Sequence, residues 1–588
     1  MGRSAVGVFA AALDAVLLAG WLLCPCRAVA DESRPSAVIE IFRVKRGALV
    51  EERSMGVLIL HDKNFPVRIH GLAPIEFRPS ASLYVYDLGA PDDLEGVFQQ
   101  SAQPPGSTAT SCCVLRNQHG VEIRFVDEHN GGAIRVEKDG VTIAVAPESL
   151  ETEHRGLQGR LSKVLPQSAG LGSRAFGPLL ITPTLNIQTA VFAEANNAWS
   201  GSMPARKSEF FYEQSNEEGL NASLNLGDYG VVVGRVSGVF SATGGLDAEA
   251  TNLGNLYPYD YALECGYLEW DSGPLFPELG YDAITISGGP QNYPIADGFL
   301  FMRGATNGGS RGADWLNPRN AFRQTGIVSL RTHDILLQGF YLEPNYNPST
   351  HIKLGGLNFQ TPLGEYVSVG FTYCNIFRSD TPQEKGMNLF YGRADATPVP
   401  AFPDFHLIGA FAAESNGQRA TGANGWYASP YYEFSQLPWS PTLYYRYASF
   451  TGGGPKGNRN FDPLFYGSSD WGSWYQGEIL GNWFVTNSNL ITHQVRAEFA
   501  PTESTTIDLL FYKFLLYSRE QDLSVPPATP VSSKNLAEEV DLAFQYAPTP
   551  WWLIAATISA AIPERAATQI TGGTQTWVQS MLTTSFTF

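Results

Sequence analysis

Charged side chains with a possible binding role stand at alternate positions of otherwise apolar or aromatic segments in the second half of the chain. Arg446 lies between two tyrosines in TLYYRYASF, and Arg496 lies between Val495 and Ala497 in THQVRAEF. Neighbouring residues of a strand project from opposite faces, so each arginine shares a face with alternate residues only. A guanidinium there can either bind an anionic solute or pair with a carboxylate. Carboxylates occur at equivalent positions, namely Glu194, Glu433, Glu498, Glu539 and Asp541, so this face is predicted to carry both signs of charge.

Other residues that could support enzyme chemistry lack the spacing that such chemistry requires. His61, Asp62, His70 and Asp127 occur in turn-like contexts, where polar side chains usually cap or stabilise the turn. The chain has no G-x-S-x-G, no H-E-x-x-H and no paired-carboxylate motif. We therefore expect no enzyme activity.

The cysteines do not form a metal-binding pattern. Cys112, Cys113, Cys265 and Cys374 include no C-x-x-C pair and have no histidine nearby at zinc spacing. A disulfide between the adjacent Cys112 and Cys113 would be strained, so two unpaired thiols are the simpler expectation, although the sequence leaves their redox state open. No metal and no cofactor are predicted.

The alternating segments that position these charges recur from about Thr184 to the end of the chain, where WVQSMLTTSFTF (577–588) ends on an aromatic residue. Short connections such as LPWSP, APTES and APTPW alternate with long polar ones. This pattern is typical of an outer-membrane β-barrel in which the last strand pairs with the first, with short periplasmic turns and long extracellular loops. The order of turns and loops is consistent only if 474–485 is a helix or an inward-folded piece of one long loop. The fold predicted is an all-β, antiparallel transmembrane barrel of about 18 strands.

Composition agrees with a membrane barrel. Of 588 residues, 16% are charged and 12% are aromatic, and no apolar run past the N-terminus reaches the roughly 18 residues of a spanning helix. A strand arginine facing lipid costs roughly 2 to 4 kcal/mol at midplane, so the strand arginines are expected to point inward. A net charge of −18 argues against a nucleic-acid partner.

The N-terminal third divides into three parts. Residues 1–30 have a basic start, an apolar centre and an A-x-A end, and are predicted to be a secretory signal peptide. Residues 36–147 alternate in short runs and are predicted to form a small periplasmic β domain, 148–177 a linker, and 178–588 the barrel. The segment GVLILHDKNFPVRIHGL resembles a periplasmic domain family of unknown function.

Three Gly-rich and aromatic stretches point to a known family. They are GRVSGVFSATGG (234–245), GFLFMRGATNGGSRGADWLNPRNAF (298–322) and FDPLFYGSSDWGSWYQGEI (461–479). Together they resemble the alginate-export porin family. The resemblance implies a single-chain barrel of about 18 strands whose lumen is constricted by inward-folded loops and lined by basic residues that pass an anionic uronate polymer.

The resemblance, together with Arg446 and Arg496, gives two sets of candidate residues. The pore-lining candidates are Arg235, Arg303, Arg311, Arg319, Arg323, Arg446 and Arg496. The constriction-loop candidates are Asp314, Trp315, Phe461, Asp462, Pro463, Leu464, Phe465 and Glu478. Each loop arginine could instead pair with a carboxylate and only support its loop.

The function predicted is an outer-membrane channel of a Gram-negative bacterium for a polar, anionic saccharide or polysaccharide. The inward carboxylates would repel a polyanion, so a general or nutrient-uptake porin, or an anchor for a periplasmic binding domain, stay open as alternatives. Expected partners are outer-membrane lipid, an anionic saccharide or other small polar solute, and periplasmic proteins that contact the N-terminal domain. The sequence does not define the solute, the direction of transport or the oligomeric state.

Overall fold

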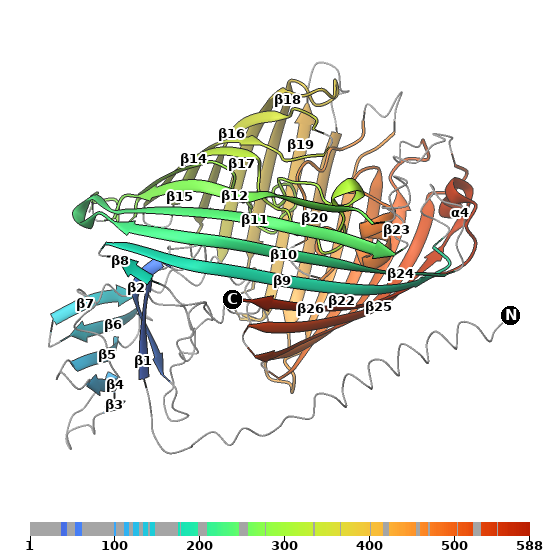
Figure 1. Ribbon diagram of the computed structural model, residues 1–588. Helices are drawn as coiled ribbons and strands as arrows, with labels where there is room; N and C mark the ends of the chain where they lie inside the picture. The colour runs from blue at the N-terminus through green and yellow to red at the C-terminus, as the bar shows by residue number, and fades with distance from the viewer. Residues whose placement is uncertain are drawn as a thin grey trace.

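The computed structural model describes most of residues 178–588 and short strands before them (Figure 1). The described segments before the barrel are 37–43, 53–60, 99–100, 111–116, 122–128, 133–138, 141–146 and 174–176. From 178 onward the description leaves out 198–207, 246–256, 274, 277, 281, 333–334, 348, 365, 400, 416–422, 454–458, 469–470, 503, 521–530 and 550.

Two small antiparallel sheets precede the barrel. The first pairs β1 (Ala37–Arg43) with β2 (Arg53–Leu60). The second contains, in order, β3 (Gln99–Gln100), β4 (Ser111–Arg116), β5 (Glu122–Glu128), β6 (Ala133–Lys138) and β7 (Val141–Ala146). These strands fall within the predicted domain at 36–147. The predicted signal peptide and all of the predicted linker except parts of 174–177 lie outside the described residues, as do the side chains of Cys112 and Cys113.

The rest of the chain is a closed barrel in which β9 to β26 pair in sequence order, each antiparallel to the next. These are β9 (Leu179–Ala195), β10 (Ser208–Asn225), β11 (Val231–Gly245), β12 (Tyr259–Asp271), β13 (Ile284–Gly288), β14 (Gln324–Thr332), β15 (Ile335–Glu343), β16 (Lys353–Pro362), β17 (Val367–Arg378), β18 (Met387–Ala396), β19 (Phe405–Ser415), β20 (Ala423–Glu433), β21 (Thr442–Phe450), β22 (Leu490–Thr502), β23 (Thr505–Leu516), β24 (Asn535–Thr549), β25 (Trp552–Pro563) and β26 (Trp577–Thr587). A short β8 (Arg174–Phe176) adds to the start of β9. The predicted barrel of about 18 strands is confirmed.

The barrel closes through its last strand, as the sequence predicted. β26 pairs with β25 on one side and with β9 on the other, from Val578 opposite Ala195 to Thr587 opposite Asn186. The backbone N–H of Phe588 donates to the carbonyl of Leu185 at 2.8 Å, and the reverse bond measures 3.0 Å. Every strand of the barrel therefore has two neighbours, which leaves no open sheet edge.

Helices occur only in connections within the described residues. α4 (Arg565–Thr571) joins β25 to β26, and η4 (Gly227–Tyr229) and η5 (Gly309–Arg311) are single turns. The π-helix η7 (Gly477–Gly481) lies in the connection between β21 and β22, which confirms the prediction that 474–485 is not a strand. No described helix is both long and apolar enough to cross a membrane.

The outer face of the barrel is apolar. Exposed side chains there include Phe210 at 65%, Leu268 at 66% and Phe371 at 49%, each on the opposite face from its buried neighbours. A soluble protein rarely exposes so much contiguous apolar surface, whereas a barrel in a bilayer requires it. The fold therefore suits lipid outside and polar groups inside.

Inward side chains differ in burial between the two ends of the barrel. In β22 the inward residues from Leu490 to Arg496 are buried, whereas Glu498 and Ala500 are half-buried. β9, which runs the other way, shows the reverse order: its inward residues are half-buried until Ala190 and buried from there to Glu194. The buried ends face the long connections. Something therefore fills the long-loop half of the lumen, while the short-turn half remains open to solvent.

Candidate functional site in the barrel lumen

Two long connections fill the lumen, the first inward loop (289–323) and the second inward loop (451–489), and we call them together the plug. Their backbones pair at Phe301 and Phe465. The N–H groups of Met302 and Arg303 both donate to the carbonyl of Phe465, at 2.8 and 2.9 Å, and Phe465 donates to Leu300 at 3.0 Å. The two stretches that the sequence singled out thus form one unit, as predicted for constriction loops.

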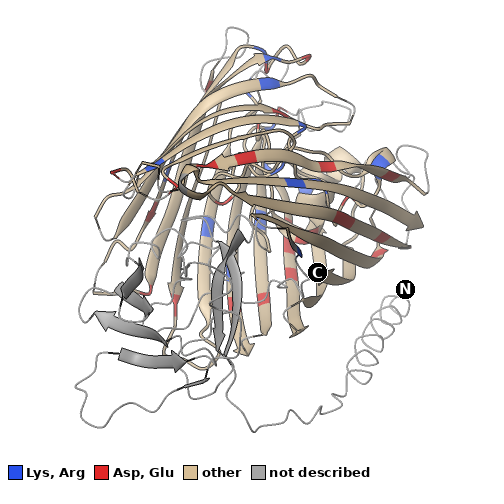
Figure 2. Cartoon of the chain, turned by 60° about the vertical axis from the view of Figure 1, so that its left-hand side comes forward, with Lys and Arg blue, Asp and Glu red and all other residues tan. Residues whose placement is uncertain are grey.

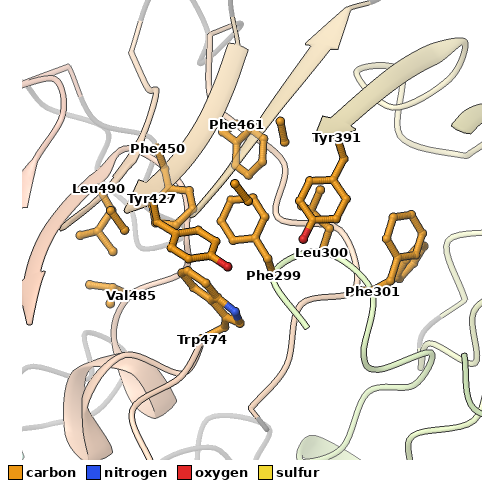
Figure 3. Packing of buried hydrophobic residues seen from close by; sticks show 14 of the residues in the cluster. Phe299, Leu300, Phe301, Tyr391, Tyr427, Phe450, Phe461, Trp474, Val485 and Leu490 are labelled. Carbon is orange, nitrogen blue, oxygen red and sulfur yellow. The ribbon is translucent and has the colours of Figure 1, made fainter. Parts of the chain in front are cut away.

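An aromatic cluster holds this unit together (Figure 3). The ring of Phe299 lies 4.8 Å from Trp474, 5.3 Å from Tyr427 and 5.9 Å from Phe450, measured between centroids. Phe461 of the second inward loop stacks on the same ring at 6.3 Å. Burial of each such side chain contributes about 1.5 to 3 kcal/mol. Because Tyr427 and Phe450 belong to the barrel wall, the cluster fixes the plug against β20 and β21.

Inward carboxylates of the wall bind backbone N–H groups of the first inward loop. Glu213 of β10 accepts from residues 315 and 316 at 3.1 and 2.8 Å, and is 0% exposed. Glu264 of β12 accepts from residues 320 and 321 at 2.7 and 2.8 Å. A carboxylate that accepts two N–H groups replaces much of its lost hydration, so these acids stabilise the loop.

The second inward loop is held in the same way from the opposite wall. Glu539 of β24 accepts from residues 479 and 480 at 2.7 and 2.8 Å, and Asp541 accepts from Glu478 at 3.4 Å. Gly477 has φ of +87°, and a Cβ there would lie 2.7 Å from the Glu539 carboxyl, so glycine permits this approach. The prediction that Glu539 and Asp541 face inward is confirmed. The plug covers both side chains, which are 0% and 1% exposed, so they hold the loop and do not repel a polyanion in the open lumen.

A third buried acid joins the two loops. Glu478 is 6% exposed, and its Oε2 accepts the indole N–H of Trp315 at 3.2 Å. Burial, and secondarily the Asp541 carboxylate, raise the pKa of Glu478 to about 8. Glu478 is therefore largely protonated at neutral pH, which reduces its repulsion with the Asp541 carboxylate.

The other predicted loop residues also lie within the plug. The N–H of Asp462 donates to the carboxylate of Glu414 in β19 at 3.0 Å, and the Asp462 carboxylate accepts from the N–H of Leu464 at 3.0 Å. The carbonyl of Pro463 accepts from the N–H of Tyr466 at 3.2 Å. Asp314 is half-buried against Gly308.

Two predicted pore arginines pair with wall carboxylates. Arg235 lies 2.8 Å from Glu217, and Arg496 lies 2.9 Å from Glu498 and 2.7 Å from Asp508. Arg496 is 4% exposed, whereas Arg235 keeps contact with solvent. The pairing predicted for strand arginines therefore occurs, although the sequence named only Glu498 among the partners.

Arg311 and Arg319 share one carboxylate, Asp260 of β12. The Arg319 guanidinium donates to Asp260 Oδ2 at 3.1 Å and to Ser241 Oγ at 2.7 Å, while Arg311 Nε lies 3.7 Å from the same oxygen. Arg319 is 0% exposed. A side chain with no exposed surface cannot contact a solute, so we reassign Arg319 to the support of its loop.

Arg446 and Arg323 also depart from the predicted solute path. Arg446 is 5% exposed, its guanidinium carbon lies 4.5 Å from the centre of the Trp474 ring, and it donates to the carbonyl of Gly472. Arg323 precedes β14 and pairs at 3.0 Å with Glu343, which alternates with the interior Leu342 and so faces outward. Arg323 therefore lies at the outer rim of the barrel and not in the lumen, which corrects the prediction.

Three lumen arginines, Arg303, Arg393 and the plug-covered Arg446, form no ion pair with a carboxylate among the described residues. Arg303 lies 5.2 Å from the centre of the Tyr475 ring, and its Nε and Nη1 have no hydrogen-bond partner in the described part of the chain. Arg393 of β18 donates only to neutral oxygens, at 3.0 Å to Gln360, 3.2 Å to Asn358 and 3.3 Å to Thr372. The Asp314 carboxylate partly offsets the charge of Arg303, whose Nε and Nη1 are buried, whereas Arg393 is half-buried and bonded to neutral oxygens.

Sequence reasoning missed Arg393 and two of the loop-binding acids, Glu213 and Glu264. Arg393 alternates with outward residues in MNLFYGRADA, so the argument used for Arg446 could have found it. Glu213 shows the same signal, because it alternates with the exposed Tyr212. No such alternation identifies the residues to which Arg393 and Glu213 are hydrogen-bonded.

No family model matches the sequence, and no curated protein matches it either. Among solved structures, the barrel is similar to OccAB2 of Acinetobacter baumannii, with 11% identity, a TM-score of 0.43, and 69% of this chain and 98% of the other covered. OpdQ of Pseudomonas aeruginosa matches with 10% identity, a TM-score of 0.44, and 69% and 97% covered. The outer membrane protein OpdK of the same species matches with 12% identity, a TM-score of 0.43, and 69% and 98% covered. Similarity at this level carries no argument about function, and the resemblance to alginate-export porins stays a prediction.

Proposed function

We propose that the protein is an outer-membrane channel for a small polar solute, and that it favours anionic saccharides. A closed barrel with an apolar outer face and charged inner face is suited to span a bilayer around a polar path. The observation that carries the preference for anions is Arg393, a lumen guanidinium held by neutral oxygens alone.

The electrostatic argument rests on which charges remain uncompensated. Arg235 and Arg496 lie within 3.0 Å of carboxylates, so their fields largely cancel at range. Wall acids such as Glu213 and Glu539 are covered by the plug. Arg303, Arg393 and Arg446 form no ion pair among the described residues, but the plug covers Arg446 and the Arg303 Nε and Nη1 atoms are buried. Arg393 is therefore the best placed of the three to attract an anion.

Neutral polar groups around Arg393 support a saccharide as the solute. Asn358 of β16 accepts from Thr372 at 2.9 Å and donates to Gln338 at 2.9 Å, which continues to Ser329 at 3.1 Å. This row of amides and hydroxyls crosses the inner wall from β14 to β18. A sugar acid has a carboxylate that suits a guanidinium and hydroxyls that suit amides.

The plug also supports an alternative function for the protein. It buries the inward residues of the long-loop half, so a barrel that conducts poorly and anchors a periplasmic domain at residues 36–147 is the second candidate. Measured solute flux separates the two functions, because an anchor needs none.

Flux into liposomes containing the purified protein tests the proposal. We expect glucuronate to enter faster than glucose, and Arg393→Gln to remove most of that difference. Arg323→Gln is the matched control, because this arginine lies at the outer rim with 49% of its side chain exposed, and it should leave both rates unchanged. Equal entry of both sugars into wild-type liposomes would favour a general porin, and no entry of either would favour an anchor.

A further inference from the structure

Charged residues of the barrel strands point inward or lie near the long-loop rim, with one exception among the described strands. Figure 2 shows that acidic and basic residues both occur along the wall. The outward pairs Lys353 with Glu343 and Lys513 with Glu538 lie near the long-loop ends of their strands. Glu218 faces outward in the middle of β10.

The orientation of Glu218 follows from its neighbours. Glu213 binds the plug and Glu217 pairs with the lumen residue Arg235, so both point inward. Glu218 is exposed on the other face, which is the face of Leu220, itself 49% exposed. Glu218 is opposite Leu185 in β9 and Gly238 in β11, and Gly238 is opposite the exposed Leu263 in β12. The carboxylate thus lies among lipid-facing apolar residues.

Further polar groups continue from Glu218 along the same face. Thr189 donates to Gln214 at 2.6 Å, and Gln214 donates to Asn216 at 2.6 Å. Tyr261 donates to Glu218 at 3.3 Å. We call Thr189, Gln214, Asn216, Glu218 and Tyr261 the outer polar patch. An acidic residue on the lipid face is unfavourable near midplane, and unsatisfied amides cost more in lipid than in water.

The surface beside the patch permits close approach of another backbone. The outward face of β11 carries three glycines, Gly234, Gly238 and Gly244. A Cβ at Gly238 would lie 2.4 Å from the Tyr261 hydroxyl, so this glycine lets Tyr261 reach across β11 to Glu218. Small residues at such positions are typical of packed interfaces in membranes.

We propose that the outer polar patch is an interface between two copies of this chain. The inference rests on the placement in a bilayer that the proposed function requires. A two-fold axis normal to the membrane brings the same residues at the same depth together, so an isologous interface needs groups that complement themselves. An amide and a hydroxyl each contain a donor and an acceptor. Gln214, Asn216 and Tyr261 meet this requirement, and the Tyr261 hydroxyl donates to Glu218.

Cysteine cross-linking in native membranes tests the interface. Asn216→Cys is compared with Val328→Cys, a 51% exposed outward position of β14, both with Cys112 and Cys113 changed to serine. A short bis-maleimide should convert most Asn216→Cys protein to a band of twice the chain mass and leave Val328→Cys monomeric. Equal, low cross-linking of the two variants would overturn the proposal, and so would an adduct of any mass other than two chains.

A second variant separates this inference from the channel function. Changing Gln214, Asn216 and Glu218 together to leucine should shift the protein in mild detergent from dimer to monomer while solute flux per chain stays within twofold. A wild-type protein that is already monomeric but conducts would overturn the interface alone. A dimer that passes no solute would overturn the channel alone.

Discussion

The indole N–H of Trp315 donates to the carboxyl of Glu478 at 3.2 Å, which joins the two inward loops beyond their backbone pairing at Phe301 and Phe465. Trp315 is also held by Glu213 of β10, and the residues after Glu478 are held by Glu539 of β24. β10 and β24 lie on either side of the closing strands β25, β26 and β9. The plug is therefore braced across the seam at which the barrel closes.

Replacing Trp315 with phenylalanine should loosen this connection. The variant loses one hydrogen bond to a buried, largely neutral acid, which costs about 1 kcal/mol. We expect a lower temperature for conversion of the compact electrophoretic band to the unfolded one, and more frequent current fluctuations. Trp426→Phe is the control, because Trp426 faces outward and is 37% exposed. The same conversion temperature in both variants would show that the bond to Glu478 does not stabilise the plug.

The attachment of the second inward loop should weaken as pH rises. The pKa of Glu478 is raised from 4.5 to about 8, so the folded state binds more protons than the unfolded state between these values. This contribution to the free energy of unfolding is fully present below pH 4.5, falls as pH rises and is lost above pH 8. Glu478→Gln should reduce the pH dependence by the contribution of this one acid. Thermal unfolding of both proteins from pH 5 to pH 9 measures it, and parallel curves would contradict the assignment.

Arg319→Gln should reduce assembly without a specific change in selectivity. Arg319 is 0% exposed, and its loss removes the hydrogen bonds to Asp260 and Ser241 and leaves Asp260 only the longer contact with Arg311 at 3.7 Å. Breaking a buried charge pair costs roughly 3 kcal/mol, at the low end of the range because Asp260 is 36% exposed. The fraction of compact protein after refolding gives the effect. Arg323→Gln should refold nearly like wild type, because Arg323 is 49% exposed and the Glu343 carboxylate keeps its ion pair with Lys353 at 2.7 Å.

The contrast between Arg319 and Arg323 shows how far alternation predicts side-chain direction. It correctly predicted that Arg235, Arg446 and Arg496 face inward, because each lies well inside a strand. Arg323 precedes the first residue of β14, where the pattern no longer constrains the backbone. The burial of Arg319 depends on where the first inward loop meets β11 and β12, which local sequence does not encode.

Three other features were predictable for a related reason: the closure of the barrel, the number of its strands and the assignment of 474–485 to a loop. They follow from the order of short and long connections, a property of the whole chain. The contacts between wall carboxylates and the plug were not predictable, because Glu213 and residues 315–316 are about a hundred positions apart and meet only once the barrel has closed.

Removing Thr587 and Phe588 should impair assembly. Phe588 exchanges two backbone hydrogen bonds with Leu185, and its ring lies 5.7 Å from that of Trp551. Without them the seam between β26 and β9 begins with unpaired groups at the lipid boundary. We expect at least a tenfold lower yield of compact protein in outer-membrane fractions. Phe588→Leu keeps the backbone bonds and should assemble nearly as wild type. Normal yield of the truncated protein would contradict the role of this pairing.

The reversal potential of the wild-type channel across a KCl gradient in planar bilayers tests the central claim most directly. Arg393, which is held by neutral oxygens, predicts a weak preference for chloride, which fades as salt shortens the screening length below about 8 Å. Arg393→Gln should move the potential toward zero. A wild-type channel that prefers potassium at low salt, or a membrane with no channel current, would contradict the account.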